Sequence, residues 1–283
     1  MFKNSLFFKV ILVFTLPAVG MLYFSTVLVS EKIDSLKEIY KTYDNLEYME
    51  NTEKLIHSLQ KERGLSVTYN ESKEFKSQLI NQRAVSDENF NNYIKFANQF
   101  FKKDLSNLAL ESKIKEIQDK FYEISNKRDA IEKFAYSSLE ILDDYSKINQ
   151  QLLDSIYSLK SIKAAADFNS EFLNIFYFLS FKEQVGIERA LISLAIIKGE
   201  VNDSLKEELL KTYTKQKVNF DYFHTHSSIK ILDIYNRQSI QKVINKIEEI
   251  KLNLDNSKSL KNISVEEWWK LSTIKISCCF YRF

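Results

Sequence analysis

Apolar residues recur every three or four positions through most of the chain, which is the period of one helix face. A clear example is the set Thr52, Ile56, Leu59, Arg63 and Ser66, whose successive steps are four, three, four and three. Because the sequence has only one proline and four glycines, it contains few residues that would interrupt helices. The pattern therefore predicts an all-α protein.

The same periodicity predicts about eight helices outside any membrane segment, enough for two packed four-helix bundles or one elongated bundle. Ser86, followed by two acids, is typical of a helix N-cap. Gly199 is expected to end one helix, Asn202 or Asp203 to cap the next, and Ser264 with Glu267 to form a capping box. Helices are predicted over 30–69, a short segment ending near 85, 89–101, 110–159, 167–198, 205–223, 239–254 and from 264 onward.

Residues 10–29 carry no charge for 20 positions, which is about the length needed to cross a hydrocarbon core of roughly 30 Å. The apolar run is longer than the core of a typical signal peptide and lacks a clean cleavage site before Glu31. We therefore predict a transmembrane helix, with a cleaved signal peptide as the alternative.

Charges on the two sides of this segment favour one orientation in the cell membrane. The positive-inside rule places residues 1–9 in the cytoplasm and residues 30–276 outside it, in a periplasm if the cell has one. The charges concerned are Lys3 and Lys9 before the segment, and Glu31, Lys32 and Asp34 after it.

Two Glu-Arg pairs, Glu62-Arg63 and Glu188-Arg189, occur in a chain that has only six arginines. Each arginine lies on the apolar face of its predicted helix, where a leucine would normally be expected. A buried guanidinium without an anion costs several kcal/mol. Each arginine is therefore expected to meet an anion.

The sequence leaves two identities open for that anion. One is a glutamate from another helix, for example Glu183 or Glu188 as the partner of Arg63. The other is a small anion held by two guanidinium groups, whose planar forks suit oxyanions better than lysine does. Gly64 and Gly186 lie close to the two arginines, where backbone or ligand can approach closely.

Other chemistry finds little support in the sequence. The formal net charge is +2 and no long basic run is present, so we do not expect nucleic-acid binding. His224 and His226 point apart on a helix and do not make a metal site. No catalytic constellation or cofactor motif is recognisable, and we expect neither an enzyme nor a bound cofactor.

Four segments together resemble the NIT domain, a nitrate- and nitrite-sensing module of bacterial receptors. They are LIHSLQKERGLS at 55–66, QRAVSD at 82–87, FKEQVGIERALISLA at 181–195 and SVEEWWKLSTIKI at 264–276. The K-E-R-G and E-R-A elements are the most specific of them. The resemblance covers about residues 40–276 in the right order.

The resemblance implies an all-helical sensor of two four-helix bundles that binds nitrate or nitrite where the bundles meet. It also implies a homodimer that serves a chemotaxis receptor, a histidine kinase or a cyclic-dinucleotide enzyme. The family's ligand arginines carry over onto Arg63 and Arg189. Secondary candidates around the site are Arg83, Gln60, Lys61, Gln82, Glu183, Gly64 and Gly186.

The sequence departs from the family pattern after the W-W segment, where a second membrane span and an output domain are normally found. It ends instead in SCCFYRF, including the adjacent Cys278 and Cys279, whose oxidation state stays open. We interpret residues 277–283 as an aberrant or truncated tail, with a genuine short sensor that signals through a partner as the alternative. A second function class is a membrane-anchored helical scaffold whose buried arginines pair only with internal glutamates.

Overall fold

The computed structural model describes residues 6–103, 108–159, 166–229, 231–232, 241–252, 254 and 263–278. Within these ranges the chain forms eight long α-helices and no strand, which confirms the predicted all-α fold. Most of the predicted tail, including Cys279, lies outside the described residues.

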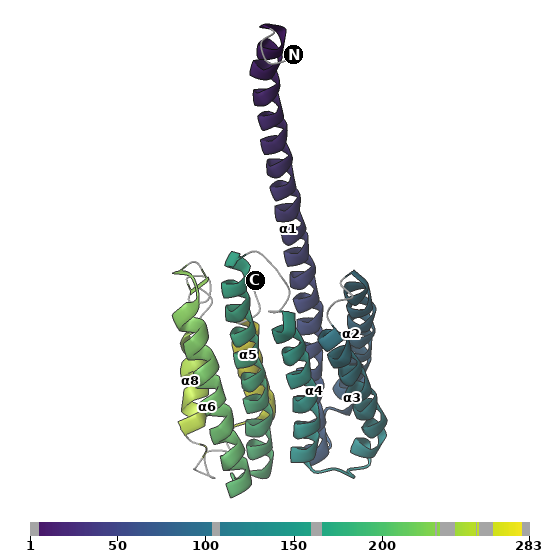
Figure 1. The fold of residues 1–283 in the computed structure, drawn as a ribbon. Coiled ribbons are helices and arrows are strands. Elements are labelled where there is room, and N and C mark those ends of the chain that lie inside the picture. Colours follow the sequence, from purple (N-terminus) through teal and green to yellow (C-terminus); the bar gives the residue numbers. More distant parts are fainter. Residues whose placement is uncertain are drawn as a thin grey trace.

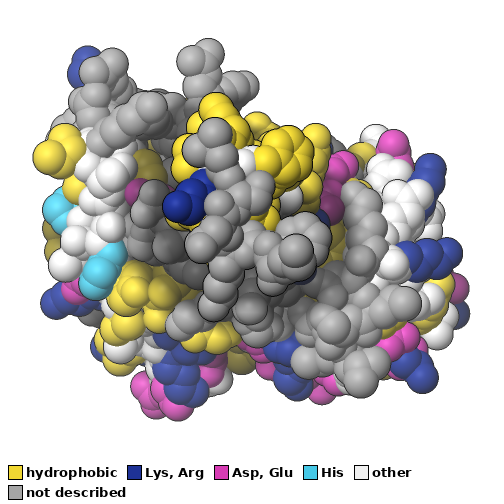
Figure 2. Space-filling model, turned by 45° about the horizontal axis from the view of Figure 1, so that its top comes forward, with side chains coloured by type: hydrophobic (Ala, Val, Ile, Leu, Met, Phe, Trp, Pro, Cys, Tyr) yellow, Lys and Arg dark blue, Asp and Glu magenta, His cyan; other side chains and the backbone are white. Residues whose placement is uncertain are grey.

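Helix α1 runs without a break from Leu6 to Ser72. The predicted membrane segment and the predicted helix after it are therefore one helix of 67 residues, whose N-terminal half projects far beyond the other helices (Figure 1). Its apolar part has a mean hydropathy of 2.0 and buries nothing against the rest of the described chain. By length and composition this part is able to cross a membrane. Figure 2, with the top of Figure 1 turned forward, shows hydrophobic side chains on this face, with basic and acidic side chains at its margins.

The first bundle consists of the C-terminal half of α1 with α2 (Lys76–Lys103), α3 (Leu108–Glu132) and α4 (Ser138–Ser158). The predicted N-cap at Ser86 is wrong, because Ser86 lies in the middle of α2. Its hydroxyl donates a hydrogen bond of 3.1 Å to the carbonyl of Gln82, one turn earlier. A serine that bonds back in this way is accommodated inside a helix.

The segment expected as one helix over 110–159 is two helices separated by a tight turn. Phe134 has a positive φ of 59°, which stops α3 because a bulky residue in this conformation cannot continue a helix. Ser137 then caps α4, and Glu140 completes a capping box with it. This S-x-x-E signal was present in the sequence and was missed.

The second bundle contains α5 (Ala166–Lys198), α6 (Asp203–His226), α8 (Gln241–Leu252) and α10 (Val265–Cys278). Gly199 ends α5 with a φ of 69° and Asn202 caps α6, as predicted. Ser264 caps α10 by accepting a bond from the Glu267 amide. The Glu267 carboxylate bonds Lys246 of α8, so the predicted capping box is confirmed only in its serine half.

The two bundles meet where α5 packs against α1 and α4. In Figure 1, α2, α3 and α4 lie on one side of this junction, and α5, α6 and α8 lie on the other. Helix α10 packs against α5 and α8. One hydrophobic core extends through both bundles, and the two Glu-Arg pairs lie on α1 and α5, the two helices that face each other across the junction.

Candidate functional site

Arg63 of α1 and Arg189 of α5 are buried at the junction of the bundles, with exposed fractions of 0% and 1%. Gln60 lies one turn before Arg63 on α1. Its backbone carbonyl accepts a hydrogen bond of 3.2 Å from Nη2 of Arg189, which brings Arg189 to the same part of α1. Burial and, next, the charge of Arg63 lower the pKa of Arg189 to about 9, although the charge of Glu183 acts to raise it. The two cations are therefore close enough to repel each other in a dry environment.

Arg63 has a carboxylate partner across the junction. Its Nη1 donates to Oε1 of Glu183 at 2.5 Å and to the hydroxyl of Ser146 at 2.9 Å. The other oxygen of Glu183 accepts bonds from the amides of Gln60 at 2.8 Å and Asn149 at 3.0 Å. Nε and Nη2 of Arg63 have no hydrogen-bond partner within the described ranges.

Arg189 is held differently. Among the described residues, its guanidinium has no carboxylate within 4 Å; it bonds the Gln60 carbonyl and, at 3.4 Å, the hydroxyl of Thr273. Its Nε has no partner in the described part of the chain. The ring of Trp269 stacks over it at 4.4 Å from the Arg189 Cζ to the ring centroid. Arg63, Arg189 and Glu183 together therefore leave one unbalanced positive charge in the junction.

Both glycines near the arginines allow close approach. A Cβ on Gly186 would lie 3.0 Å from Nη2 of Arg63 and 3.3 Å from the side-chain Cδ of Gln60. A Cβ on Gly64 would lie 2.7 Å from the ring of Trp269. A larger residue at Gly186 would press on the Arg63 guanidinium itself, and one at Gly64 would displace the Trp269 ring that lies over Arg189.

Burial lowers the pKa values of two basic groups near the arginines, Lys61 and His57. Burial and, next, the charge of Arg189 lower the pKa of Lys61. Burial also lowers the pKa of His57 to about 2, helped by the charges of Lys182 and Lys61, so this imidazole stays neutral at physiological pH. Lys182 is paired with Glu53.

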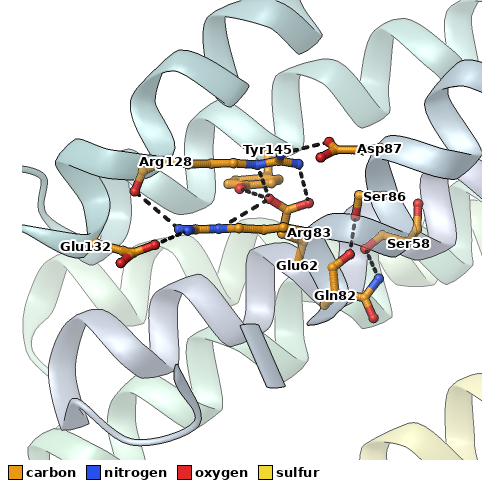
Figure 3. Close-up of polar contacts among 9 residues, drawn as sticks. All are labelled: Ser58, Glu62, Gln82, Arg83, Ser86, Asp87, Arg128, Glu132 and Tyr145. Atoms are coloured by element: carbon orange, nitrogen blue, oxygen red, sulfur yellow. Dashed lines mark hydrogen bonds and ion pairs between the residues drawn. The ribbon is translucent and has the colours of Figure 1, made fainter. Parts of the chain in front are cut away.

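Glu62, the neighbour of Arg63, points away from the junction into the first bundle (Figure 3). It accepts two bonds from Arg128, at 2.8 and 3.1 Å, and one from the hydroxyl of Tyr145 at 2.7 Å. Nε of Arg83 lies 4.0 Å from the same carboxylate, and its Nη1 bonds Glu132. The carboxylate thus ties α1 to α2, α3 and α4.

The predicted site residues Arg83 and Gln82 are accordingly in this interior network and not beside Arg63 and Arg189. The Gln82 amide donates to the Ser58 carbonyl at 3.1 Å, and Nη2 of Arg83 donates to the Arg128 carbonyl at 3.2 Å. The structure brings together Arg63, Arg189, Gln60, Glu183, Gly64 and Gly186, with Lys61 at the edge.

Glu188 plays in the second bundle the part that Glu62 plays in the first: a buried carboxylate bonded to other helices of its own bundle. It is buried and accepts from the Gln216 amide at 2.9 Å, with Lys251 at 2.5 Å and Lys275 at 3.3 Å. Burial acts to raise its pKa, but Lys275 and Lys251 outweigh this and hold the pKa of Glu188 below its usual value. In each Glu-Arg pair the glutamate therefore fixes its helix to its own bundle, and the arginine faces the other bundle.

Sequence reasoning missed several residues that contact the two arginines or Glu62. Ser146 and Asn149 of α4 and Thr273 of α10 are short polar residues with no distinctive spacing. Trp269 is part of a recognised segment, but its stacking on Arg189 depends on how α10 packs. Arg128 was one of only six arginines, and that scarcity was a usable signal.

Comparison with known proteins gives the family and a similar fold. The model of the NIT family, described as nitrate and nitrite sensing, matches residues 54–277, and no curated protein matches. The solved "Structure of the NasR transcription antiterminator" is similar with a TM-score of 0.74 and 17% identity, over 91% of this chain and 70% of that one. At that identity the similarity concerns the fold alone. Because the family model spans most of the sequence, including both Glu-Arg pairs, the chain belongs to the NIT family of nitrate- and nitrite-sensing domains.

Proposed function

We propose that this chain is a membrane-anchored sensor that binds nitrate or nitrite between Arg63 and Arg189. The observation that carries the proposal is Arg189, a fully buried guanidinium beside a second guanidinium, with no carboxylate of its own among the described residues. An unbalanced buried charge is costly unless an anion is present. A bound anion would supply the missing countercharge.

The charge balance at the junction favours a monovalent ligand. Arg63 and Arg189 contribute two positive charges and Glu183 one negative charge, so one monovalent anion makes the group neutral. Nε and Nη2 of Arg63 and Nε of Arg189 have no partner in the described chain, and these atoms are suitable donors to a planar oxyanion. Sulfate, with two charges, would leave an excess negative charge in a dry site.

The pairing of Arg63 with Glu183 favours the second function class, a scaffold with internally paired arginines. That pairing explains Arg63 but not Arg189. The scaffold would leave Arg189 buried with only a carbonyl, a hydroxyl at 3.4 Å and an aromatic ring as partners. We therefore prefer the sensor.

We further propose that residues 10–29 span the cell membrane, with residues 1–9 in the cytoplasm and the sensor body over 30–276 outside. Between the span and the bundle, α1 has a stem over 30–46; residues 30–41 are exposed, and Asn45 near its end is already buried. The stem presents apolar side chains that remain 40–69% exposed. A second copy of the chain would cover this face in the homodimer that the family predicts. The stem residues concerned are Ile33, Leu36, Ile39, Tyr40, Tyr43 and Leu46.

Anion binding would then favour the packing in which α1 and α5 converge, because both arginines gain a shared partner only there. Glu62 and Glu188 fix these helices to their own bundles, so a shift at the junction would move whole bundles. The continuous α1 would carry that shift to the membrane.

The test is calorimetry on the full chain in detergent micelles with nitrate, nitrite, chloride and sulfate. Arg189→Lys keeps the charge and removes the fork, and it should weaken nitrate binding by about 10–100-fold, equivalent to about 1.4–2.7 kcal/mol. Arg83→Lys is the matched control, a buried arginine of the interior network that should leave nitrate affinity unchanged. Equal nitrate affinity in wild type and Arg189→Lys would refute the proposal.

A further inference from the structure

The two arginines at the junction are shielded from solvent, so a dissolved anion needs a passage to reach them. On the sides formed by α1, α4 and α5, the arginines are enclosed by helices that pack against one another and share one hydrophobic core. From α10, Arg189 is covered by Trp269, whose ring centroid lies 4.4 Å from the Arg189 Cζ, and by Thr273, whose hydroxyl lies 3.4 Å from Nη1. Trp269 is the larger of the two side chains. The passage is therefore best sought at Trp269.

The two adjacent tryptophans of α10 have different surroundings. Trp268 is 1% exposed, and its indole nitrogen donates a bond of 2.9 Å to the carbonyl of Arg189. This bond fixes the backbone of α10 to α5. Trp269 is partly exposed, and its ring extends toward Gly64 of α1. One tryptophan thus anchors the helix, while the other covers the arginine.

The ring of Trp269 also borders a surface pocket with a volume of about 270 Å³. This is several times the roughly 30 Å³ that one water molecule occupies in the liquid. The pocket is formed between α1, α2 and α10, and its lining is mainly apolar. Its lining residues are Leu65, Thr68, Phe75, Gln78, Glu266 and Trp269.

We propose that Trp269 is the movable wall of the anion site: rotation of its ring into the neighbouring pocket uncovers Arg189 and opens a passage to solvent. The backbone of α10 stays in place because Trp268 holds it. When the ring returns, it excludes water from Arg189, and in the drier site each guanidinium–anion bond becomes stronger. This inference deepens the proposed function, since nitrate or nitrite would use the passage, but the wall itself can be tested without either ion.

The experiment measures how fast phenylglyoxal, an arginine-specific dicarbonyl, modifies Arg189 in the full chain in micelles. Peptide mass spectrometry follows each arginine separately. Because minor open states are typically populated at about 0.1–10%, Trp269→Ala should accelerate modification of Arg189 by at least about tenfold. Phe223→Ala is the matched control, because this buried ring packs on Phe178, about three helical turns before Arg189 on α5. It should leave the rate at Arg189 unchanged, although it lowers the melting temperature.

Two results would overturn the inference. One is an unchanged rate at Arg189 in Trp269→Ala. The other is an equal acceleration at Arg128, which lies in the first bundle and would react faster only if the variant opened generally.

Nitrate added to the same reaction separates this inference from the proposed function. If the function is right, nitrate protects Arg189 in Trp269→Ala, and sulfate does not. Fast modification without nitrate protection would support the movable wall while contradicting the nitrate site.

Discussion

Replacing Glu183 by glutamine should destabilise the protein without ligand and at the same time strengthen nitrate binding. Glu183 is 1% exposed and supplies the only carboxylate within 4 Å of Arg63 in the described chain. Glutamine keeps the shape of the side chain and removes its charge. The unbalanced charge of the junction therefore rises from one to two.

The expected magnitudes follow from this change in charge. Removing one partner of a buried ion pair costs about 3–5 kcal/mol. For a chain of this size each kcal/mol corresponds to about 2–4 °C in melting temperature, so the apo protein should melt about 6–20 °C lower. A nitrate ion relieves more repulsion in the variant than in the wild type. A tenfold gain in affinity would add about 1.4 kcal/mol to the binding free energy.

Thermal melts at increasing nitrate concentration measure both effects, since a ligand that binds only the folded state raises its stability. Glu62→Gln is the matched control, because Glu62 is equally buried but holds Arg128 and Tyr145 in the first bundle. It should lower the apo melting temperature comparably and leave nitrate affinity unchanged. If Glu183→Gln binds nitrate more weakly than wild type, Glu183 is part of the binding site and does not compete with the anion, and the charge argument fails.

Three further predictions concern the same helices. Gly186→Ala places a methyl group 3.0 Å from Nη2 of Arg63, so calorimetry should show weaker nitrate binding. The substitution should still stabilise the helix itself by about 0.5–1 kcal/mol. Unchanged affinity would show that Arg63 can shift without loss of binding. The pKa of His57 in the folded state, about 2, lies below the ordinary 6.5. Below pH 6.5 the unfolded chain therefore binds a proton that the folded chain does not, and stability falls as the pH falls. Between pH 6.5 and 5 this loss should reach up to about 2 kcal/mol in urea titrations and should be absent in His57→Gln; identical pH slopes would contradict it. Leu36 is 53% exposed and lies on the apolar face of the stem, so Leu36→Glu should shift the species seen by light scattering in micelles from dimer to monomer. Lys41→Glu, on the far side of the helix at about 100° per residue, should not.

The placement of Arg63 and Arg189 on buried helix faces was predictable, because helical periodicity depends only on local spacing. The identity of their partners was not. Both Glu183 and Glu188 are buried glutamates of α5, and one of them meets Arg63 while the other points into its own bundle. That choice depends on which face of α5 lies against α1, which is a property of packing between segments far apart in the sequence.

Helix boundaries also divide into those set by local signals, which the sequence predicts, and those set by packing, which it does not. Gly199 and Asn202 act through their own backbone and side chain, and both were predicted. Ser86 carries the same type of signal as a cap, but tertiary contacts overrule it: the neighbouring Asp87 bonds Arg128 of α3 and α2 continues through the position. The break before Ser137 depends on the positive φ of Phe134, which no local preference of phenylalanine predicts.

The continuity of α1 has a consequence for the relation between ligand and membrane. Val29 and Arg63 lie on one helix, about 50 Å apart along its axis at 1.5 Å per residue. Each residue also turns the helix by about 100°. The number of residues in the stem therefore sets the rotation about the α1 axis between the proposed span and the proposed anion site. One residue inserted near Ser35 would leave every contact of Arg63 and Arg189 intact and rotate the span by about 100°. Seven inserted residues would nearly restore the original angle. If the proposed function holds, insertions in the stem should therefore alter signalling with a helical period while anion affinity stays constant.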